Sequence, residues 1–340
     1  MNRLDLRSDT VTRPTKAMLA AMNSAEVGDD VYGEDATTNR LEEKAAHILG
    51  KEAALFCPSG TQSNLAALLT HCGRGDEYIV GQHAHTYKYE GGGAAVFGSI
   101  QPQPLDLQKD GTFDLNMVEQ HIKADDFHFA RSRLLCLENT HGGLALPHQY
   151  LIDCHTCARK NNLGLHLDGA RLFNAARKWD VAPRTIAQVF DSVSICLSKG
   201  LGAPIGSLLC GGSDFIAEAR RWRKVLGGGM RQTGCIAAAG VYALDNNITR
   251  LSEDQHNAEA LARSLARIDE LEVCYDTNQT NMIFIGIPQA HLAALHVFLR
   301  QRGIIMAQGE NVRLVTHLEI SRRDIDTIAQ AFHTFFSRQH

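Results

Sequence analysis

The sequence predicts an α/β fold, with a mostly parallel, seven-stranded-type sheet sandwiched by helices and a smaller α+β domain at the C-terminal end. Short apolar runs alternate with helical patterns over roughly the first 250 residues, which is typical of a parallel sheet covered on both faces. From about Asp245 the pattern changes to longer helices between a few short strands. A chain of 340 residues is long enough to form both units.

Runs of aliphatic and β-branched residues bounded by turn-forming residues predict the strands of the large sheet. These runs are Ala53–Cys57, Glu77–Val80, Ser99–Leu105, Arg133–Leu137, Leu163–Asp168, Ser192–Leu197 and Gly206–Cys210. Apolar residues at helical spacing between these runs predict helices. The helices are expected at Thr61–Cys72, Asn116–Lys123, Gln149–Asn161 and Asp214–Val225.

The C-terminal part predicts a compact α+β domain that begins with a long helix. Its further elements are expected at Glu272–Tyr275, Asn281–Ile287 and Asn311–Val315 as strands, and at Gln289–Arg302 and Arg322–Phe336 as helices. We place the N-terminal segment and the large domain at residues 1–248 and the small domain at residues 249–340. The first ~40 residues contain few strong elements and could wrap over a neighbour.

Composition narrows the class of protein. The 34 basic and 38 acidic residues give a net charge of −4 without a basic cluster, which argues against a nucleic-acid-binding surface. We expect no membrane span, because no run of about 18 apolar residues occurs. The start of the sequence, Met1–Arg7, lacks the apolar run of a signal peptide. Nine scattered cysteines without a disulfide-framework spacing fit a reducing cytoplasm, where we expect the protein.

Cys154 and Cys157 form the single C-x-x-C of the sequence, with His155 between them. This spacing suggests metal or redox chemistry, but no second C-x-x-C exists. Residues three apart on the helix expected here share one face. We therefore favour packing as the role of the two cysteines, and no metal site is predicted.

The strand ends near Asp168 and Lys199 carry the most informative chemistry. Asp168 ends one expected strand, in Leu167-Asp168-Gly169-Ala170-Arg171, and Lys199 follows the next, in Ser198-Lys199-Gly200. Taken singly, an Asp here is often a helix cap and a Lys in a glycine-rich turn is often only exposed. Together they supply an amine that can form a Schiff base with a cofactor aldehyde and a carboxylate that keeps a pyridine nitrogen protonated. The pair predicts pyridoxal 5'-phosphate (PLP) as cofactor.

The segment from Pro58 to Gln62 is a candidate phosphate site. It follows a strand and opens a helix, where unpaired N–H groups and the helix dipole favour anions. Gly60 would let the backbone approach a phosphate, and Thr61 would add an N–H and a hydroxyl. The alternative is simple capping by Ser59 or Thr61. A cofactor that carries a phosphate favours the first interpretation.

Several histidines are candidates for contact with the cofactor ring. His85 follows the strand ending at Val80, and His141 follows another strand end, whereas His128 lies in a loop-like stretch. Because the chain has 16 histidines, any one of them is more often structural than catalytic. Position at a strand end favours His85 and His141 but does not choose between them.

Arginines provide planar forks that bind carboxylates or phosphates. Arg171 comes three residues after Asp168 and should lie in the same pocket. Arg231 follows a glycine-rich loop that runs into a helix. Arg313 interrupts an apolar strand, where a charge is costly unless it is paired or faces an exposed edge.

The sequence resembles the low-specificity L-threonine aldolases, PLP enzymes of the aspartate-aminotransferase-like fold (fold type I, the PLP-dependent transferase-like class). The similarity spans nearly the whole chain, and its N-terminal and Asp-Gly-Ala-Arg motifs are its more specific parts. The matching segments are Asp5–Thr12, Gly28–Gly33, Pro58–Thr61, Leu137–His141, His166–Arg171, Leu197–Gly200 and Val312–His317.

The resemblance implies a role for each matching residue. Lys199 would carry the cofactor, and Asp168 would pair with the pyridine nitrogen. Gly60 and Thr61 would bind the cofactor phosphate, and Arg231 would reach this phosphate across a subunit interface. The substrate carboxylate would be bound by Ser8, Arg171 and Arg313.

The resemblance also implies that His85 stacks on the cofactor ring and that His128 approaches the hydroxyl side of the substrate. Glu90 would hold a catalytic water. The resemblance further implies a homotetramer with active sites shared between paired subunits.

The implied reaction is retro-aldol cleavage of L-threonine or L-allo-threonine, or of related β-hydroxy-α-amino acids, to glycine and acetaldehyde or the corresponding aldehyde. His85, His128 or a water held by Glu90 could take the hydroxyl proton, and the sequence leaves this choice open. The first alternative function is that of a β-eliminating lyase or an aminotransferase of the same fold. The second alternative is a protein of this fold that serves only in binding or scaffolding and has no enzymatic activity. The motif around Ser8 and the Asp-Gly-Ala-Arg run favour the aldolase.

Overall fold

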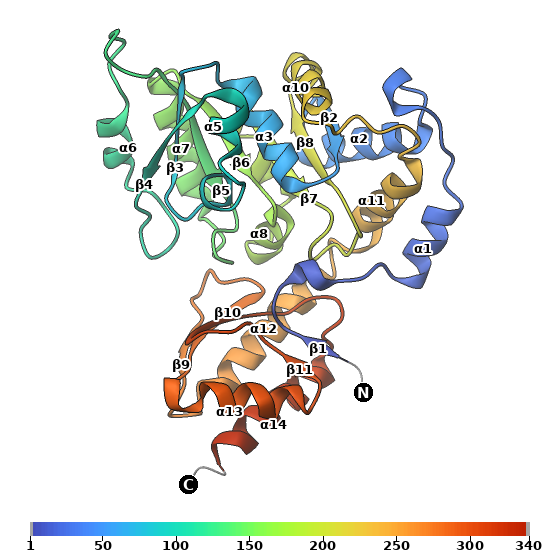
Figure 1. Cartoon of the computed structure of the whole chain (residues 1–340), viewed down its shortest axis with the longest axis vertical. Helices are drawn as coiled ribbons and strands as arrows, with labels where there is room; N and C mark the ends of the chain where they lie inside the picture. The colour runs from blue at the N-terminus through green and yellow to red at the C-terminus, as the bar shows by residue number, and fades with distance from the viewer. Residues whose placement is uncertain (1–2, 338–340) are drawn as a thin grey trace.

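The computed structural model describes residues 3–337 of the chain. The outermost residues of the two predicted domains, 1–2 and 338–340, lie outside the described residues. Figure 1 shows two lobes, with most of the helices in the upper one. The sheets have seven strands in the upper lobe and, in the lower lobe, three strands and the pair β1-β11. The α/β fold class predicted from the sequence is confirmed.

The large sheet has the spatial order β2-β8-β7-β6-β5-β3-β4. Its strands are β2 (Ala53–Cys57), β3 (Glu77–Gly81), β4 (Gln101–Leu105), β5 (Ser132–Glu138), β6 (Gly164–Asp168), β7 (Ser192–Cys196) and β8 (Ser207–Gly211). β8 runs antiparallel to both of its neighbours, and every other neighbouring pair is parallel. The carboxyl ends of β2, β3, β5, β6 and β7 therefore lie along one edge of the sheet.

Helices cover both faces of this sheet (Figure 1). On one face, α3 packs on β2, β6, β7 and β8 and is flanked by α5 and α10. On the other face lie α2 and α7, with α11 packed between α2 and α1. The helices of this lobe are α1 (Lys16–Asn23), α2 (Ala36–Leu49), α3 (Gly60–His71), α4 (His85–Lys88), α5 (Gly93–Gly98), α6 (Leu115–His121), α7 (His148–Lys160), α8 (Leu172–Lys178), α9 (Pro183–Ala187), α10 (Ser213–Val225) and α11 (Gly234–Asn246), with the 3-10 turns η1 (Asp9–Val11) and η2 (Asp30–Tyr32).

The central strand β6 shows how the sheet divides its side chains. Leu165 and Leu167 point into the main apolar core on the α7 side, and both are fully buried. His166 and Asp168 alternate with them and point toward α3, where both hydrogen-bond to Asn64. Because alternate residues of a strand face opposite sides, the sequence of β6 places its polar side chains on one face only.

The small lobe has its own hydrophobic core. Its elements are α12 (Leu251–Leu265), β9 (Glu272–Cys274), β10 (Met282–Gly286), α13 (Gln289–Arg300), β11 (Ile304–Ile305), β12 (Asn311–Val315) and α14 (Arg322–Phe336). Helix α12 starts in the core of the large lobe at Leu251 and continues in the core of the small lobe from Ala258. The two cores thus meet within α12, close to the predicted domain boundary, which stays a prediction.

The N-terminal segment belongs to both lobes. β1 (Leu4–Asp5) pairs in parallel with β11, and Leu4 and Leu6 pack in the core of the small lobe. The Leu6 carbonyl also accepts a hydrogen bond from the Val315 N–H at 2.8 Å. A few residues later the chain reaches the large lobe, where the Thr12 hydroxyl donates to the Lys199 carbonyl at 3.0 Å.

The predicted strands and helices agree with the structure to within one or two residues at each end. Helices α1, α2 and α11 are among the elements that were not predicted, although Leu41, Ala45 and Leu49 of α2 are spaced as on one helix face. Among the described residues, no helix combines the length and the apolar character that crossing a bilayer requires.

Candidate active site

Segments that leave the large sheet at its carboxyl edge form the candidate site. Gly60 begins α3 after β2, and His85 begins α4 after β3. Asp168 ends β6 opposite Glu138, which ends β5 and is its partner in register. Lys199 lies in the turn after β7. This edge is where open α/β sheets bind ligands.

The Asp168 carboxylate is buried and is hydrogen-bonded by neutral groups. Asn64 Nδ2 donates to Oδ2 at 2.9 Å, and the Ala170 N–H donates to Oδ1 at 3.1 Å. Burial, together with the negative charge of Glu138, raises the pKa of Asp168. A cationic group beside this carboxylate would restore its ionised form. A protonated pyridine nitrogen is such a group, so the environment of Asp168 fits the predicted cofactor.

His85 and Glu90 form a pair beside Asp168. His85 Nδ1 lies 2.7 Å from Glu90 Oε1, and Asn64 Nδ2 donates to the same oxygen at 2.9 Å. The hydrogen bond with Glu90 raises the pKa of His85, and burial raises the pKa of Glu90. One ligand-type atom from each of His85, Glu90 and Asp168 lies within 4.8 Å of the others. The structure thus brings together three residues that the sequence analysis had singled out.

These three side chains could also act as ligands of a metal ion, but the hydrogen bonds that two of them accept from Asn64 oppose metal binding. The amide N–H groups of Asn64 point at the carboxylates of Asp168 and Glu90. These N–H groups occupy one oxygen of each carboxylate, where a bound cation would compete with them.

The Lys199 amine lies among the acidic groups of the site. Its positive charge favours the ionised forms of Asp9 and Asp168 and opposes protonation of His85. The backbone of this turn is fixed from the N-terminal segment through Thr12. The role of Lys199 in holding a cofactor stays a prediction.

Arg171 is held by an acidic residue to which the sequence analysis gave no role. Its Nε and Nη2 donate to Asp9 Oδ2 and Oδ1 at 2.7 and 2.6 Å, and the Asp9 side chain is completely buried. Although burial opposes it, the charge and hydrogen bonds of Arg171 lower the pKa of Asp9 to about 2. The fork of Arg171 is therefore already occupied by a carboxylate of the chain itself.

Arg313 lies on β12 and faces the same site from the small lobe. It is close enough to Arg171 that, together with partial burial, the positive charge of Arg171 lowers the pKa of Arg313. Its Nη2 donates to the Arg7 carbonyl at 3.3 Å. Ser8, which follows Arg7, caps η1 by accepting from the Thr10 N–H at 3.2 Å.

The start of α3 has the features of an anion site. The Ser59 hydroxyl caps the helix by accepting from the Gln62 N–H at 3.1 Å, so the capping interpretation holds for Ser59. The N–H groups of Gly60 and Thr61 lie in the first turn of the helix, where no carbonyl of the same helix can accept from them, so they are free to bind an anion. A Cβ at position 60 would lie 2.8 Å from Cys196 Sγ, so glycine is needed for this helix start to lie against β7.

Two buried polar atoms just after β5 have no hydrogen-bond partner among the described residues, Asn139 Nδ2 and Thr140 Oγ1. Buried polar groups are normally satisfied by protein, water or ligand. The environment of Asp168 and the free N–H groups at the start of α3 are the observations that fit a cationic ring nitrogen and a phosphate.

Arg231 does not point into this site within one chain. Its Nη1 donates to Asp29 Oδ2 at 2.9 Å, and its side chain is 55 % exposed. The loop before it does touch α3, because Gln62 Nε2 donates to the Leu226 carbonyl at 3.2 Å.

His128 is also not brought to this site within one chain. It lies on an exposed loop, where its Nδ1 is 2.6 Å from Asp126 Oδ1 and its side chain is 66 % exposed. The loop precedes β5, whereas the site lies at the other end of that strand. A strand of this length separates its ends by roughly 20 Å. Sequence position alone could not show on which side of the sheet the loop emerges.

Cys154 and Cys157 lie on α7 and both are buried in the core of the large lobe. Burial raises the pKa of Cys154 to about 12 and also raises the pKa of Cys157. Thiols in such surroundings are unreactive. The structure agrees with packing as their role.

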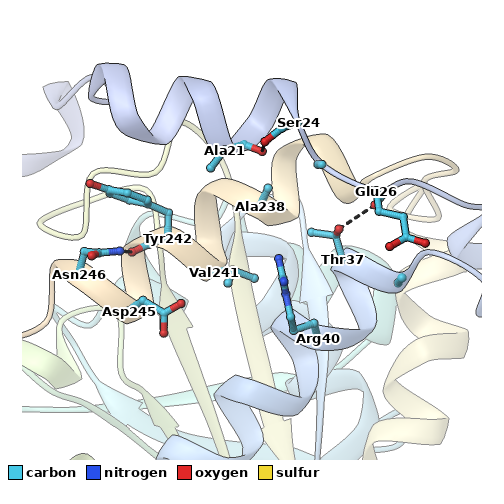
Figure 2. A pocket seen from close by; sticks show the side chains of 12 residues that line it. Ala21, Ser24, Glu26, Thr37, Arg40, Ala238, Val241, Tyr242, Asp245 and Asn246 are labelled. Carbon is cyan, nitrogen blue, oxygen red and sulfur yellow. Dashed lines mark hydrogen bonds between the residues drawn. The ribbon is translucent and has the colours of Figure 1, made fainter.

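A cavity of about 670 Å³ lies elsewhere, between α1, α2 and α11 (Figure 2). Its polar lining includes Arg40, Asp245 and Tyr242, and the Thr37 hydroxyl on its wall donates to the Glu26 carbonyl. None of the residues of the candidate site lines it. It therefore does not contribute to the chemistry at the edge of the sheet.

Sequence reasoning missed Asp9, Asn64 and Glu138. Glu138 ends an expected strand and could have been found by the criterion that selected Asp168. Asp9 stands within a segment that matches the aldolases, but its pairing with Arg171 joins distant parts of the chain. Asn64 gave no signal, because its importance depends on which side of α3 faces β6.

Comparisons with known proteins agree with this geometry. The chain superposes on a threonine aldolase from Leishmania major with a TM-score of 0.83, covering 98% of this chain and 99% of that one at 20% sequence identity. The fold is therefore that of the PLP-dependent transferase-like α/β proteins. Residues 5–288 match the family model described as β-eliminating lyase.

Full-length relatives give a narrower assignment. The chain is 53% identical over 335 residues to a low specificity L-threonine aldolase of Escherichia coli K12, covering 98% of this chain and all of that one. A probable low-specificity L-threonine aldolase of Arabidopsis thaliana is 43% identical, covering 98% and 97%. The chain belongs to the β-eliminating lyase family and, within it, to the low-specificity L-threonine aldolases.

Proposed function

We propose that this chain is a PLP-dependent lyase that cleaves L-threonine, L-allo-threonine and related β-hydroxy-α-amino acids to glycine and an aldehyde, acetaldehyde from threonine. The supporting observation is full-length identity of 53% to an aldolase of that name, combined with Asp168 and Lys199 at one edge of the sheet. When bound, PLP accepts the electron pair released at the substrate Cα.

Each residue of the site would act on a defined group. Lys199 would hold the cofactor, and Asp168 would keep a proton on its ring nitrogen. The free N–H groups of Gly60 and Thr61 would bind its phosphate. Arg231, which contacts Asp29 here, would reach that phosphate from a paired subunit.

The substrate carboxylate would bind mainly to Arg313 and Ser8. The charge of Arg171 is already neutralised by Asp9, which it holds through two hydrogen bonds. Arg313 donates one hydrogen bond to the Arg7 carbonyl, so its other N–H groups remain available for a substrate carboxylate. A carboxylate fixed in this way orients the Cα–Cβ bond for cleavage, and such orientation lowers a barrier by roughly 7 kcal/mol or more.

The proton of the substrate hydroxyl would pass to the pair formed by His85 and Glu90. Glu90 holds His85 Nδ1, which leaves Nε2 as the free acceptor, and a water on Glu90 is the other route. If His85 is the base, His85→Asn should remove its ionisation from the pH profile of kcat, whereas Glu90→Gln should only move that ionisation to lower pH, because the hydrogen bond with Glu90 raises the pKa of His85. If the water on Glu90 is the route, Glu90→Gln should remove the ionisation instead. His128 would act only on the site of another subunit.

The direct test is product analysis. The purified protein, supplied with PLP and L-threonine, should release glycine and acetaldehyde in equal amounts, measured by amino-acid analysis and a coupled dehydrogenase assay. Release of 2-oxobutanoate and ammonia instead would favour the β-eliminating alternative, which the names of the full-length relatives do not favour. Absence of any turnover would contradict the proposal.

We further propose a cytoplasmic homotetramer with active sites shared between subunits. Large apolar side chains are exposed on the N-terminal segment and on the His128 loop, including Tyr32 at 75% and Phe127 at 92%. The nine cysteines are all free thiols. Light scattering during size-exclusion chromatography tests the tetramer, and a monomer would contradict it.

A further inference from the structure

A buried polar interface joins α3 to the central strands β6 and β7. Asn64 and His71 contribute from α3, two turns apart on one face of the helix, and His166 and Ser192 contribute from paired positions of β6 and β7. His166, Ser192 and Asn64 are 0%, 0% and 2% exposed. We call these four residues the α3 seam.

The seam is one continuous chain of hydrogen bonds that begins at Asp168. Asn64 Nδ2 contacts Asp168 at 2.9 Å, and Asn64 Oδ1 lies 3.3 Å from His166 Nε2. His166 Nδ1 lies 2.8 Å from Ser192 Oγ, which lies 2.7 Å from His71 Nε2.

The donors of this chain can be assigned by exclusion. Both hydrogens of the Asn64 amide are used, one on Asp168 and one on Glu90. Its oxygen must therefore accept from His166 Nε2–H, which makes His166 Nδ1 an acceptor. Ser192 then donates to His166, and its oxygen accepts from His71 Nε2–H. Each proton in the chain has one position.

Both histidines are neutral in this environment. Burial lowers the pKa of His166 to about 3 and that of His71 to about 4. A neutral imidazole has one donor and one acceptor nitrogen, as the assignment requires. The network places polar groups in a buried interface, where apolar side chains could pack without the free-energy cost of desolvating polar groups.

We propose that His166, held by Ser192 and His71, is a positioning residue that fixes the orientation of the Asn64 amide and thereby ties Asp168 and Glu90 into one rigid unit. This inference rests on the proposed function, because Asp168 matters through a cofactor ring. Without His166 the amide of Asn64 could rotate and present its oxygen to two carboxylates. Asp168 would then lose a donor and shift away from the ring nitrogen.

Ser192 and Ser194 offer a matched test. They lie two residues apart on β7, face the same helix and are 0% and 1% exposed. Ser192 hydrogen-bonds to the two histidines of the seam, whereas Ser194 donates to Ser63 at 2.7 Å, outside it. Ser192→Ala therefore breaks the seam, and Ser194→Ala removes one buried hydrogen bond from the same interface without touching it.

The readouts are the dissociation constant of PLP from the full-length protein, followed by fluorescence quenching, and the ¹⁵N resonance of ring-labelled PLP in the bound state. We expect Ser192→Ala to weaken PLP binding by about tenfold, and Ser194→Ala by less than about twofold. We also expect the ring nitrogen resonance to move toward its unprotonated position only in Ser192→Ala. Equal effects of the two substitutions would overturn the proposal.

Variants of His166 and the wild-type tautomer complete the test. His166→Gln retains a donor and an acceptor and should restore the ring nitrogen signal that His166→Leu loses. In the protein without cofactor, ¹⁵N spectra of labelled histidine should show His166 protonated at Nε2 only. An Nδ1–H tautomer or an imidazolium at neutral pH would contradict the assigned chain. This last measurement needs neither PLP binding nor turnover, so it separates failure of the seam from failure of the proposed function.

Discussion

The two faces of the central strands are equally buried but differ in chemistry. Toward α7, β6 and β7 present Leu165, Leu167, Val193 and Ile195, each completely buried in one apolar core. Toward α3 the same strands present polar side chains that each hydrogen-bond to a residue of that helix: His166, Asp168, Ser192 and Ser194. Burial of the apolar face stabilises the folded protein. Burial of the polar face stabilises it less, because polar groups lose their hydration, but the hydrogen bonds fix the positions of these side chains. The comparison predicts that substitutions on the first change stability and substitutions on the second change chemistry.

The largest effect on chemistry is expected at the edge between the two faces. Lys199→Ala should abolish aldehyde formation, because its amine is the group that holds the cofactor. Lys199 is only half-buried, so the free energy of unfolding should change by less than about 1 kcal/mol. The coupled dehydrogenase assay measures aldehyde formation, and urea unfolding measures the free energy of unfolding. An active Lys199→Ala protein would contradict the assignment of the site.

Asp168→Asn tests the polar face directly. We expect kcat/KM to fall by roughly 100- to 1000-fold, since a neutral amide cannot stabilise positive charge on the ring nitrogen. The pKa of Asp168 is raised by burial and Glu138, so removing its charge should leave the cofactor-free protein at least as stable as before. A loss of stability that parallels the loss of activity would show that Asp168 is mainly structural.

Leu167→Ala tests the apolar face. Removing this completely buried side chain should lower the free energy of unfolding by about 2–5 kcal/mol through lost transfer energy and a residual cavity. The activity per folded molecule should stay close to that of the wild type, because Leu167 points away from α3. Urea unfolding and active-site titration would measure both, and a variant that keeps its stability but loses turnover would remove the distinction between the faces.

A smaller effect concerns Asp9, which belongs to neither face. Its pKa is lowered from 3.8 to about 2 in the folded protein, so the folded state binds this proton less readily than the unfolded state does. The resulting stability is present above pH ~4 and is lost as the pH falls through 2, and it amounts to roughly 2 kcal/mol.

The measurement for Asp9 compares unfolding free energies at pH 5 and pH 3 in the wild type and in the double variant Asp9→Asn with Arg171→Met. The wild type should lose more stability on acidification. A double variant with the same pH dependence would mean that the ion pair of Asp9 and Arg171 contributes nothing to it.

Local patterns in the sequence were enough to predict the strands and the residues at their ends. Asp168 and Lys199 could be identified because each follows an apolar run, and the end of a parallel strand has a known place in the fold. The helix α11 was missed because it is rich in alanine and buried on most sides, so it lacks a polar face to mark its period. The roles of Asn64 and Asp9 depend on contacts with His166 and Arg171, which lie more than 100 residues away. No local pattern reports such contacts.

The parallel pairing of β1 with β11 has a consequence for synthesis of the protein. Leu4 and Leu6 are separated from their partners Ile304 and Val315 by about 300 residues, and the whole large sheet lies between them in the sequence. A nascent chain can therefore build the large sheet before β1 meets β11, and the contact that ties the N-terminal segment to the small lobe forms after that sheet.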